Sequence, residues 1–136
     1  MRWFVLTATA LVALAGAAYA FGGASSSPGN GAYALVVGTS GTPQLIQSHT
    51  NGFVSANVGT FGQGDYCLTP APGVDVVHTA AVASEEANYS SVIGVPTVRY
   101  PTSSASAGCN AGQLEVKTFD SSVALSNQIA FTVNVP

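Results

Sequence analysis

Short apolar runs separated by turn residues dominate the chain from about residue 32 onward, and no long segment keeps a helical period. Several runs alternate apolar and polar residues, as strands do when they bury one face. Turn signals recur about every eight to twelve residues, which is typical of an antiparallel sandwich or barrel. We therefore expect an all-β fold, an antiparallel β-sandwich of about 7 to 9 short strands. The predicted strands cover residues 33–37, 44–50, 53–58, 65–69, 76–83, 92–100, 114–118 and 129–135.

Glycine-containing turns suggest which of these strands pair. The segment 38–41 (GTSG) is predicted to join the first two strands as a hairpin, because its glycines can supply positive φ. Asn51-Gly52 predicts a second hairpin, with a two-residue loop that pairs Thr50 with Phe53. Pro96 cannot donate to a strand ladder, so its strand is predicted to lie at an edge or to carry a bulge.

The alternation also assigns faces to individual side chains. Tyr66 and Leu68 share one face and Cys67 the other, so we expect Tyr66 in the core. Glu115 and Lys117 alternate with apolar residues and are predicted to face solvent. The segments 62–64, 84–91 and 101–112 are predicted to be turns or loops.

The N-terminus has the pattern of a secretory signal peptide. Arg2 precedes an apolar run, and residues 18–20 (AYA) form a small-x-small cleavage site. A retained membrane anchor is the alternative, but the run is shorter than the roughly 20 apolar residues that a spanning helix needs. We expect a cleaved signal peptide at 1–20, a flexible lead-in at 21–31 and one domain at 32–136. This predicts secretion to an extracytoplasmic location and no integral membrane association after cleavage.

Charge is scarce in this chain. Lys, Arg, Asp and Glu together make up 7% of it, and Arg99 and Lys117 are the only basic side chains beyond Arg2, against six acidic ones. Nucleic acids and anionic membranes bind clustered Lys and Arg, so neither is an expected partner. The mean hydropathy of +0.36 also argues against disorder.

Cys67 and Cys109 are the two cysteines of a chain with an export signal, and an even count in an oxidising compartment favours one disulfide. Two buried free thiols are the alternative. A Cys-His metal site lacks the usual spacing, since no C-x-x-C occurs and neither His49 nor His78 has a ligand-like neighbour. No metal or cofactor is expected.

The order of these signals resembles a loosely defined group of small, mostly uncharacterised exported bacterial β-rich domains. The segments that carry the resemblance span nearly all of the chain after residue 20: 33–36 (YALV), 64–68 (GDYCL), Cys109, 114–120 (LEVKTFD) and 130–135 (AFTVNV). These motifs specify strands and turns. The resemblance therefore implies an all-β fold and export, and it carries over no catalytic residue.

No motif predicts a reaction. Residues 38–41 are one residue short of a nucleophile elbow, and Glu85-Glu86 is expected to be an exposed acidic tip rather than half of a glycosidase pair. His49 or His78 could act as a base with an aspartate as its partner, but nothing in the sequence brings them together. The candidate aspartates are Asp65, Asp75 and Asp120. We therefore expect no catalytic residue.

The leading hypothesis is a non-enzymatic exported β-sandwich that acts as a structural, surface or interaction module, with an unknown protein or glycan as its partner. A carbohydrate or small-ligand binding module is the first alternative, with Tyr89 and Tyr100 as the predicted contacts, because aromatic rings stack on sugars. A small secreted hydrolase is the second. Asn88 begins a glycosylation sequon, which is expected to be unused in a bacterial protein.

Overall fold

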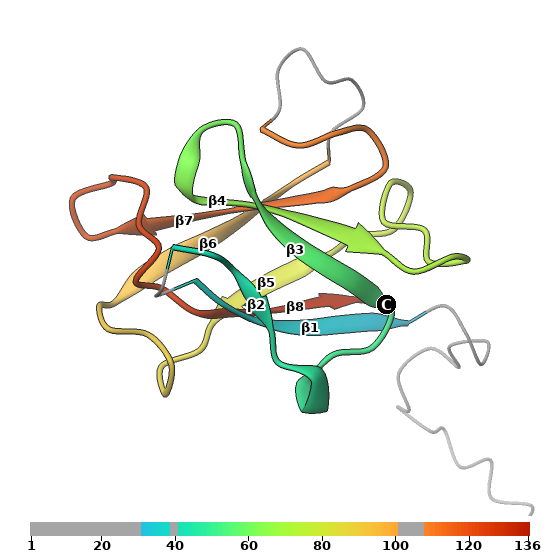
Figure 1. Ribbon diagram of the computed structural model, residues 1–136, viewed down its shortest axis with the longest axis horizontal. Helices are drawn as coiled ribbons and strands as arrows, with labels where there is room; N and C mark the ends of the chain where they lie inside the picture. The colour runs from blue at the N-terminus through green and yellow to red at the C-terminus, as the bar shows by residue number, and fades with distance from the viewer. Residues whose placement is uncertain (1–30, 39–40, 101–107) are drawn as a thin grey trace, which may run out of the picture.

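A computed structural model describes residues 31–38, 41–100 and 108–136, and its strands form two antiparallel four-stranded sheets that pack face to face (Figure 1). One sheet has the order β2-β1-β8-β5 and the other the order β3-β4-β7-β6. The strands are β1 (Ala32–Val37), β2 (Gln44–Leu45), β3 (Phe53–Gly59), β4 (Gly62–Pro70), β5 (Val82–Glu85), β6 (Gly94–Arg99), β7 (Leu114–Asp120) and β8 (Phe131–Val135). The predicted all-β sandwich is confirmed.

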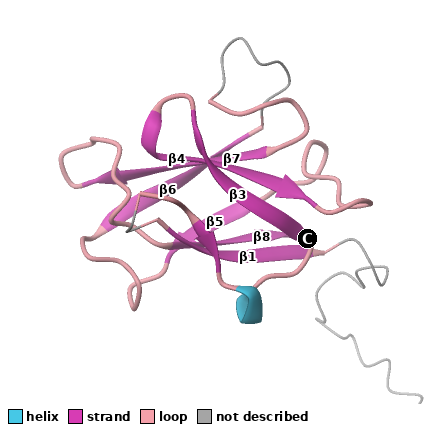
Figure 2. Cartoon of the chain, viewed as in Figure 1, coloured by secondary structure: helices cyan, strands magenta, loops and turns pink. Residues whose placement is uncertain are grey.

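The described residues contain a single helical element, the 3-10 turn η1 (Gln47–His49), which lies on the connection from β2 to β3 (Figure 2). None of their helices is long and apolar enough to cross a membrane. The predicted signal peptide at 1–20 and nearly all of the lead-in at 21–31 lie outside the described residues.

The core lies between the inner faces of the two sheets. Alternate residues of each central strand point inward, as the period of two predicts, and Tyr66 and Leu68 of β4 are both buried. Tyr66 meets Phe131 of β8 across the core with ring centroids 5.3 Å apart. Burying side chains of this size contributes about 1.5–3 kcal/mol each, so this contact between sheets is a main source of stability. The predicted core position of Tyr66 is confirmed.

Two predicted features of the connections are confirmed. β1 and β2 pair as antiparallel neighbours, with the amide of Gly41 donating to the carbonyl of Gly38 at 3.0 Å, so the segment between them closes a hairpin. Pro96 lies in β6, at the edge of its sheet, where its missing N–H is tolerated.

The predicted hairpin at Asn51-Gly52 is wrong. Residues 44–50 form only the two-residue β2 and then η1, and Phe53 pairs with Pro70 of β4 instead of with Thr50. The backbone of Asn51 bonds in both directions to Tyr33, at 2.9 and 2.8 Å. Asn51 therefore closes the edge of the first sheet, and Gly52, with a φ of 77°, turns the chain across to the second sheet.

The predicted strand at 76–83 is also largely wrong, because only Val82–Glu85 is extended and paired. Asp75 explains the difference. Its carboxylate accepts hydrogen bonds from the amides of Val77 and His78 at 2.9 and 3.0 Å, so these amides bond locally instead of joining a ladder. Two predicted loop boundaries shift as well: β5 extends to Glu85, and β4 begins at Gly62.

Candidate functional site

The outer face of the sheet β2-β1-β8-β5 is the first candidate site. Tyr33 of β1 lies opposite Asn134 of β8, and Asn134 lies opposite Val82 of β5, so these three side chains form one row across the sheet. Thr132 and Ser84 form the next row on the same face. Because the inward residues of β8 fill the core, these outward residues are free to contact a ligand.

A concavity of about 790 Å³ opens over these rows. Its lining exposes more apolar than polar surface and contains no charged side chain. Tyr33, with 48% of its surface exposed, is the aromatic member. Hydroxyl and amide groups from Asn51, Ser84, Thr132 and Asn134 provide hydrogen-bonding groups around it. The arrangement suits a neutral ligand that combines an apolar face with hydroxyl groups.

His49 lies beside the same face. A smaller concavity of about 290 Å³ is lined by His49 together with Tyr33, Thr132 and Asn134. The turn η1 positions the imidazole there, since His49 is the last residue of that turn. The sequence provided no signal for this proximity, because η1 replaces part of a predicted strand.

The outer face of the sheet β3-β4-β7-β6 carries the second candidate site. Asp65 and Cys67 of β4 lie opposite Lys117 and Glu115 of β7, respectively, so all four side chains point to this face. The chain has only three basic and six acidic residues, yet two carboxylates and a lysine gather here. Such a concentration indicates a specific role rather than general solubility.

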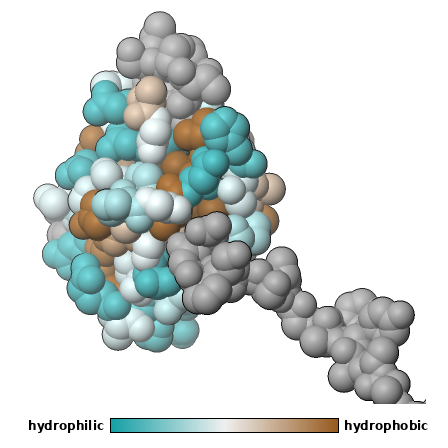
Figure 3. Space-filling view, turned by 90° about the vertical axis from the view of Figure 1, so that its right-hand side faces the viewer, coloured by the Kyte–Doolittle hydropathy of each residue, from teal (hydrophilic) through white to brown (hydrophobic). Residues whose placement is uncertain are grey.

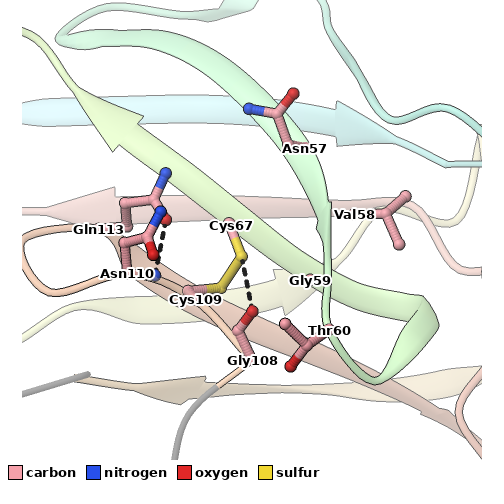
Figure 4. A pocket seen from close by; sticks show the side chains of 9 residues that line it. All are labelled: Asn57, Val58, Gly59, Thr60, Cys67, Gly108, Cys109, Asn110 and Gln113. Carbon is pink, nitrogen blue, oxygen red and sulfur yellow. Dashed lines mark hydrogen bonds between the residues drawn. A yellow bond between two sulfur atoms is a disulfide. The ribbon is translucent and has the colours of Figure 1, made fainter. Parts of the chain in front are cut away.

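The loop that precedes β7 covers this face (Figure 4). The disulfide between Cys67 and Cys109 anchors the loop, with 5.3 Å between the two Cα atoms, which confirms the predicted bridge. A polar concavity of about 390 Å³ lies over the disulfide, with Asn57, Thr60 and Gln113 in its lining. Asp65 and Glu115 are both fully buried in the folded chain.

The predicted solvent-facing position of Glu115 and Lys117 is therefore wrong. The alternation placed both side chains on the outer face correctly, but residues 108–113 and the disulfide cover that face. Phe61 completes the cover, with the Lys117 ammonium nitrogen 3.7 Å from the centre of its ring. The side chain of Lys117 is only 12% exposed.

Each buried carboxyl group has one bonded and one unpartnered oxygen. Oδ2 of Asp65 accepts a hydrogen bond from the amide of Phe61 at 3.2 Å, and Oε1 of Glu115 accepts one from the amide of Gly108 at 3.1 Å. Oε1 also lies 3.3 Å from Nζ of Lys117 and 3.9 Å from the Arg99 guanidinium. Asp65 Oδ1 and Glu115 Oε2 have no other partner.

The two carboxyl groups lie close enough to affect each other's ionisation. Burial raises the pKa of Asp65, and the neighbouring Glu115 raises it further through charge repulsion and a hydrogen bond, against the lowering effects of the Phe61 amide and of Lys117. Two carboxyl groups in contact cannot both ionise at low cost. The protonated form of Asp65 is thus favoured more than in an exposed aspartate, while Glu115 is paired with Lys117.

The described residues bring Asp65, Glu115 and Cys109 within 4.8 Å of one another, a spacing that could suit a metal ion. The chemistry does not suit one, because Cys109 Sγ is committed to the disulfide. Lys117 also already supplies the positive charge next to Glu115.

The predicted ligand contacts Tyr89 and Tyr100 lie elsewhere. Both are exposed, at 46% and 38%, and neither lines the three concavities described above. The hydroxyl of Tyr100 accepts a hydrogen bond from the amide of Ala81 at 2.5 Å and donates to its carbonyl at 3.3 Å. Their role in binding stays a prediction.

Of the two histidines, His78 has a carboxylate partner. Its Nδ1 lies 2.9 Å from Oδ2 of Asp75, on an exposed turn, and hydrogen bonds from the His78 backbone and side chain lower the pKa of Asp75. The sequence could have indicated this pair, because Asp at the start of a turn commonly bonds the residues two and three positions on.

No family model, curated protein or solved structure matches this chain. Its classification therefore rests on the fold: it is a small β-rich domain of two sheets.

Proposed function

We propose that this chain is an exported, non-enzymatic β-sandwich that acts as an interaction module, with the outer face of β1, β8 and β5 as its contact surface. The observation that carries the proposal is the open concavity around Tyr33, which has no charged side chain in its lining. The signal-peptide pattern and the disulfide support an oxidising, extracytoplasmic location.

The chemistry of this face favours a neutral saccharide as the ligand. Sugar rings present an apolar face that stacks on an aromatic side chain and hydroxyl groups that bond amides and hydroxyls. Tyr33 provides the aromatic ring for stacking. Thr132 and Asn134, on the adjacent strand β8, provide the hydroxyl and amide groups for hydrogen bonds. A lining without charged side chains offers an ionic ligand no side chain to pair with.

One end of the molecule bears on the kind of partner. The end of the molecule seen in Figure 3 has its apolar residues in small groups among polar ones, rather than in one continuous patch. Large continuous apolar patches are the usual mark of an extensive protein–protein interface. The dimensions of the concavity instead fit a ligand of a few sugar units.

A glycan array tests the saccharide, with Tyr33→Ala as the diagnostic variant. Loss of one stacked aromatic ring is expected to weaken binding about tenfold, from about 1.4 kcal/mol of lost contact. Tyr89→Ala is the matched control, because Tyr89 is exposed to a similar extent, at 46% against 48%. If the array shows no binding, or if Tyr33→Ala and Tyr89→Ala weaken glycan binding equally, the proposed saccharide site at Tyr33 is wrong. If Tyr100→Ala also weakens glycan binding as much as Tyr33→Ala does, the binding site lies at Tyr89 and Tyr100, as the sequence predicts.

Enzymatic activity is tested separately with generic ester, peptide and glycoside substrates. The exposed pair of His78 and Asp75 is the arrangement that a hydrolase would use most readily. Turnover that His78→Ala or His49→Ala abolishes would contradict the non-enzymatic proposal. Turnover that survives both substitutions would point to a contaminating enzyme.

A further inference from the structure

Asp65 and Lys117 are direct cross-strand partners. They pair in the antiparallel register of β4 and β7, so their side chains leave the sheet side by side on its outer face. Directly opposed residues have Cβ atoms about 4.5–5.5 Å apart. The amine lies 3.3 Å from Glu115 Oε1 and over the Phe61 ring, and a change of rotamer along the four methylene groups of lysine would bring it to the aspartate carboxyl carbon.

Glu115 lies between the two groups. It precedes Lys117 by two residues on β7 and therefore shares its face. Its Oε1 lies 3.3 Å from the lysine Nζ, its Oε2 has no hydrogen-bond partner, and one oxygen of its carboxyl group lies within 4.8 Å of one from Asp65. Glu115 thus contacts the lysine amine through Oε1 and lies near the Asp65 carboxyl group.

The surroundings of the trio exclude water. Asp65 and Glu115 are fully buried, and Phe61 covers the amine. Two glycines fit the cover closely, since a Cβ on Gly59 or Gly108 would overlap the Asp65 carboxyl group. In a dry site, neutral forms of an amine and an acid gain over their ions, and a desolvated lysine becomes a nucleophile.

We propose that this cluster is a self-modification site, in which Nζ of Lys117 and Cγ of Asp65 condense to an intramolecular amide with Glu115 as the proton carrier. The three side chains are held in one rigid sheet, so the reaction is unimolecular and gains the large effective concentration of fixed reactants. The product joins the two central strands of the sheet covalently, beside the disulfide.

The reaction needs no oxidant, reductant or additional reactant. Glu115 Oε1 takes one proton from the Lys117 ammonium, and the neutral Nζ attacks Cγ of the protonated Asp65 carboxyl group. Glu115 then delivers a proton to the departing hydroxyl, which leaves as water when the Nζ–Cγ bond is complete. Nζ passes its second proton to the Glu115 carboxylate, which ends as a carboxylic acid and accepts a hydrogen bond from the N–H of the new amide through its carbonyl oxygen.

Mass spectrometry of the full chain tests the proposal directly. After denaturation and reduction of the disulfide, the folded and purified protein is expected to be lighter than its sequence by one water molecule, once any N-terminal processing is accounted for. A sequence mass without this loss overturns the proposal, whatever the variants do.

Trypsin locates the bond. Beyond Arg2 the chain has only two tryptic sites, Arg99 and Lys117. An acylated Lys117 is not cleaved, so residues 100–136 are expected to stay joined to the fragment that contains Asp65 after reduction. Water loss together with cleavage after Lys117 means dehydration elsewhere and overturns the assignment.

Variants assign the roles. Lys117→Arg keeps the cation beside Glu115 but has no amine that condenses, and Asp65→Ala removes the acceptor, so both are expected to show the full sequence mass. Glu115→Gln is also expected to show the full sequence mass, because the residue that carries the protons is lost. Asp75→Ala, at an exposed carboxylate, is the control that keeps the water loss. Water loss that persists in Asp65→Ala overturns the choice of acceptor.

Discussion

Loss of the disulfide should remove a large part of the stability of this domain. The bond joins residues 42 positions apart, between β4 and the loop before β7. For a loop of that size the chain-entropy relation gives about 4 kcal/mol at room temperature, because the open chain regains conformations that the link denied it. Domains of this kind are typically stable by only about 5–15 kcal/mol.

Urea unfolding measures the effect most directly in the Lys117→Arg background, where the amide proposed above cannot form and the disulfide is the only link. Cys67→Ala combined with Cys109→Ala is compared with the oxidised parent. We expect a loss of about 4 kcal/mol, or slightly more, because both cysteines are buried and their replacement leaves a small cavity. The m-value should rise, since the unlinked unfolded chain exposes more surface.

The native state adds a second expected effect. The disulfide anchors the loop over Asp65 and Glu115, so its removal admits water to the pair. Reduction of the parent with a thiol should reproduce most of the loss without creating a cavity. A change below about 1 kcal/mol in both comparisons would refute the reasoning, because it would mean that the loop is held as firmly by non-covalent contacts.

Three further outcomes are expected. In the Lys117→Arg background, burial holds the pKa of Asp65 above its ordinary value, so this carboxyl group binds more protons in the folded state. Its contribution to the unfolding free energy should be greatest in acid and be lost as the pH rises through its folded pKa, and urea titrations of Asp65→Asn against the parent should show this difference. Gly108→Ala should cost about 1–3 kcal/mol in thermal unfolding, because its methyl group overlaps the Asp65 carboxyl group, and an unchanged midpoint would contradict the close cover. Val123 is a β-branched residue at a φ of 64°, so Val123→Gly should stabilise by roughly 1 kcal/mol, whereas Val95→Gly, in an exposed strand position, should destabilise.

Local patterns predicted the parts of the fold that depend on local physics. The alternation in residues 129–135 identified the inward face of β8, and the same rule placed Tyr66 inside and Cys67 outside, because side chains of a strand alternate whatever covers them. The hairpin between β1 and β2 followed from its glycines. The turn at Asn51-Gly52 failed because its backbone bonds to Tyr33, a partner that the local sequence does not encode.

The sequence did not predict the candidate saccharide face around Tyr33, for a related reason. The pattern assigns Tyr33 to a strand, but the sequence does not say that β1 lies between β2 and β8, with β5 on the far side of β8. Only that strand order brings Asn134 and Val82 into the same row as the tyrosine. The sequence predicts Tyr89 and Tyr100 as ligand contacts because they lie at loop edges, where a side chain can be inferred to be exposed without knowing the topology.

The buried acid cluster, by contrast, could have been inferred from the sequence. Cys67 was placed on the face opposite Tyr66 and Leu68, and its predicted partner Cys109 was placed in a loop. A disulfide between them requires that loop to lie over the outer face of β4. Asp65, two residues before Cys67, must then lie under the same cover. The prediction of the disulfide thus already implied a buried carboxyl group on a face that its polarity alone had assigned to solvent.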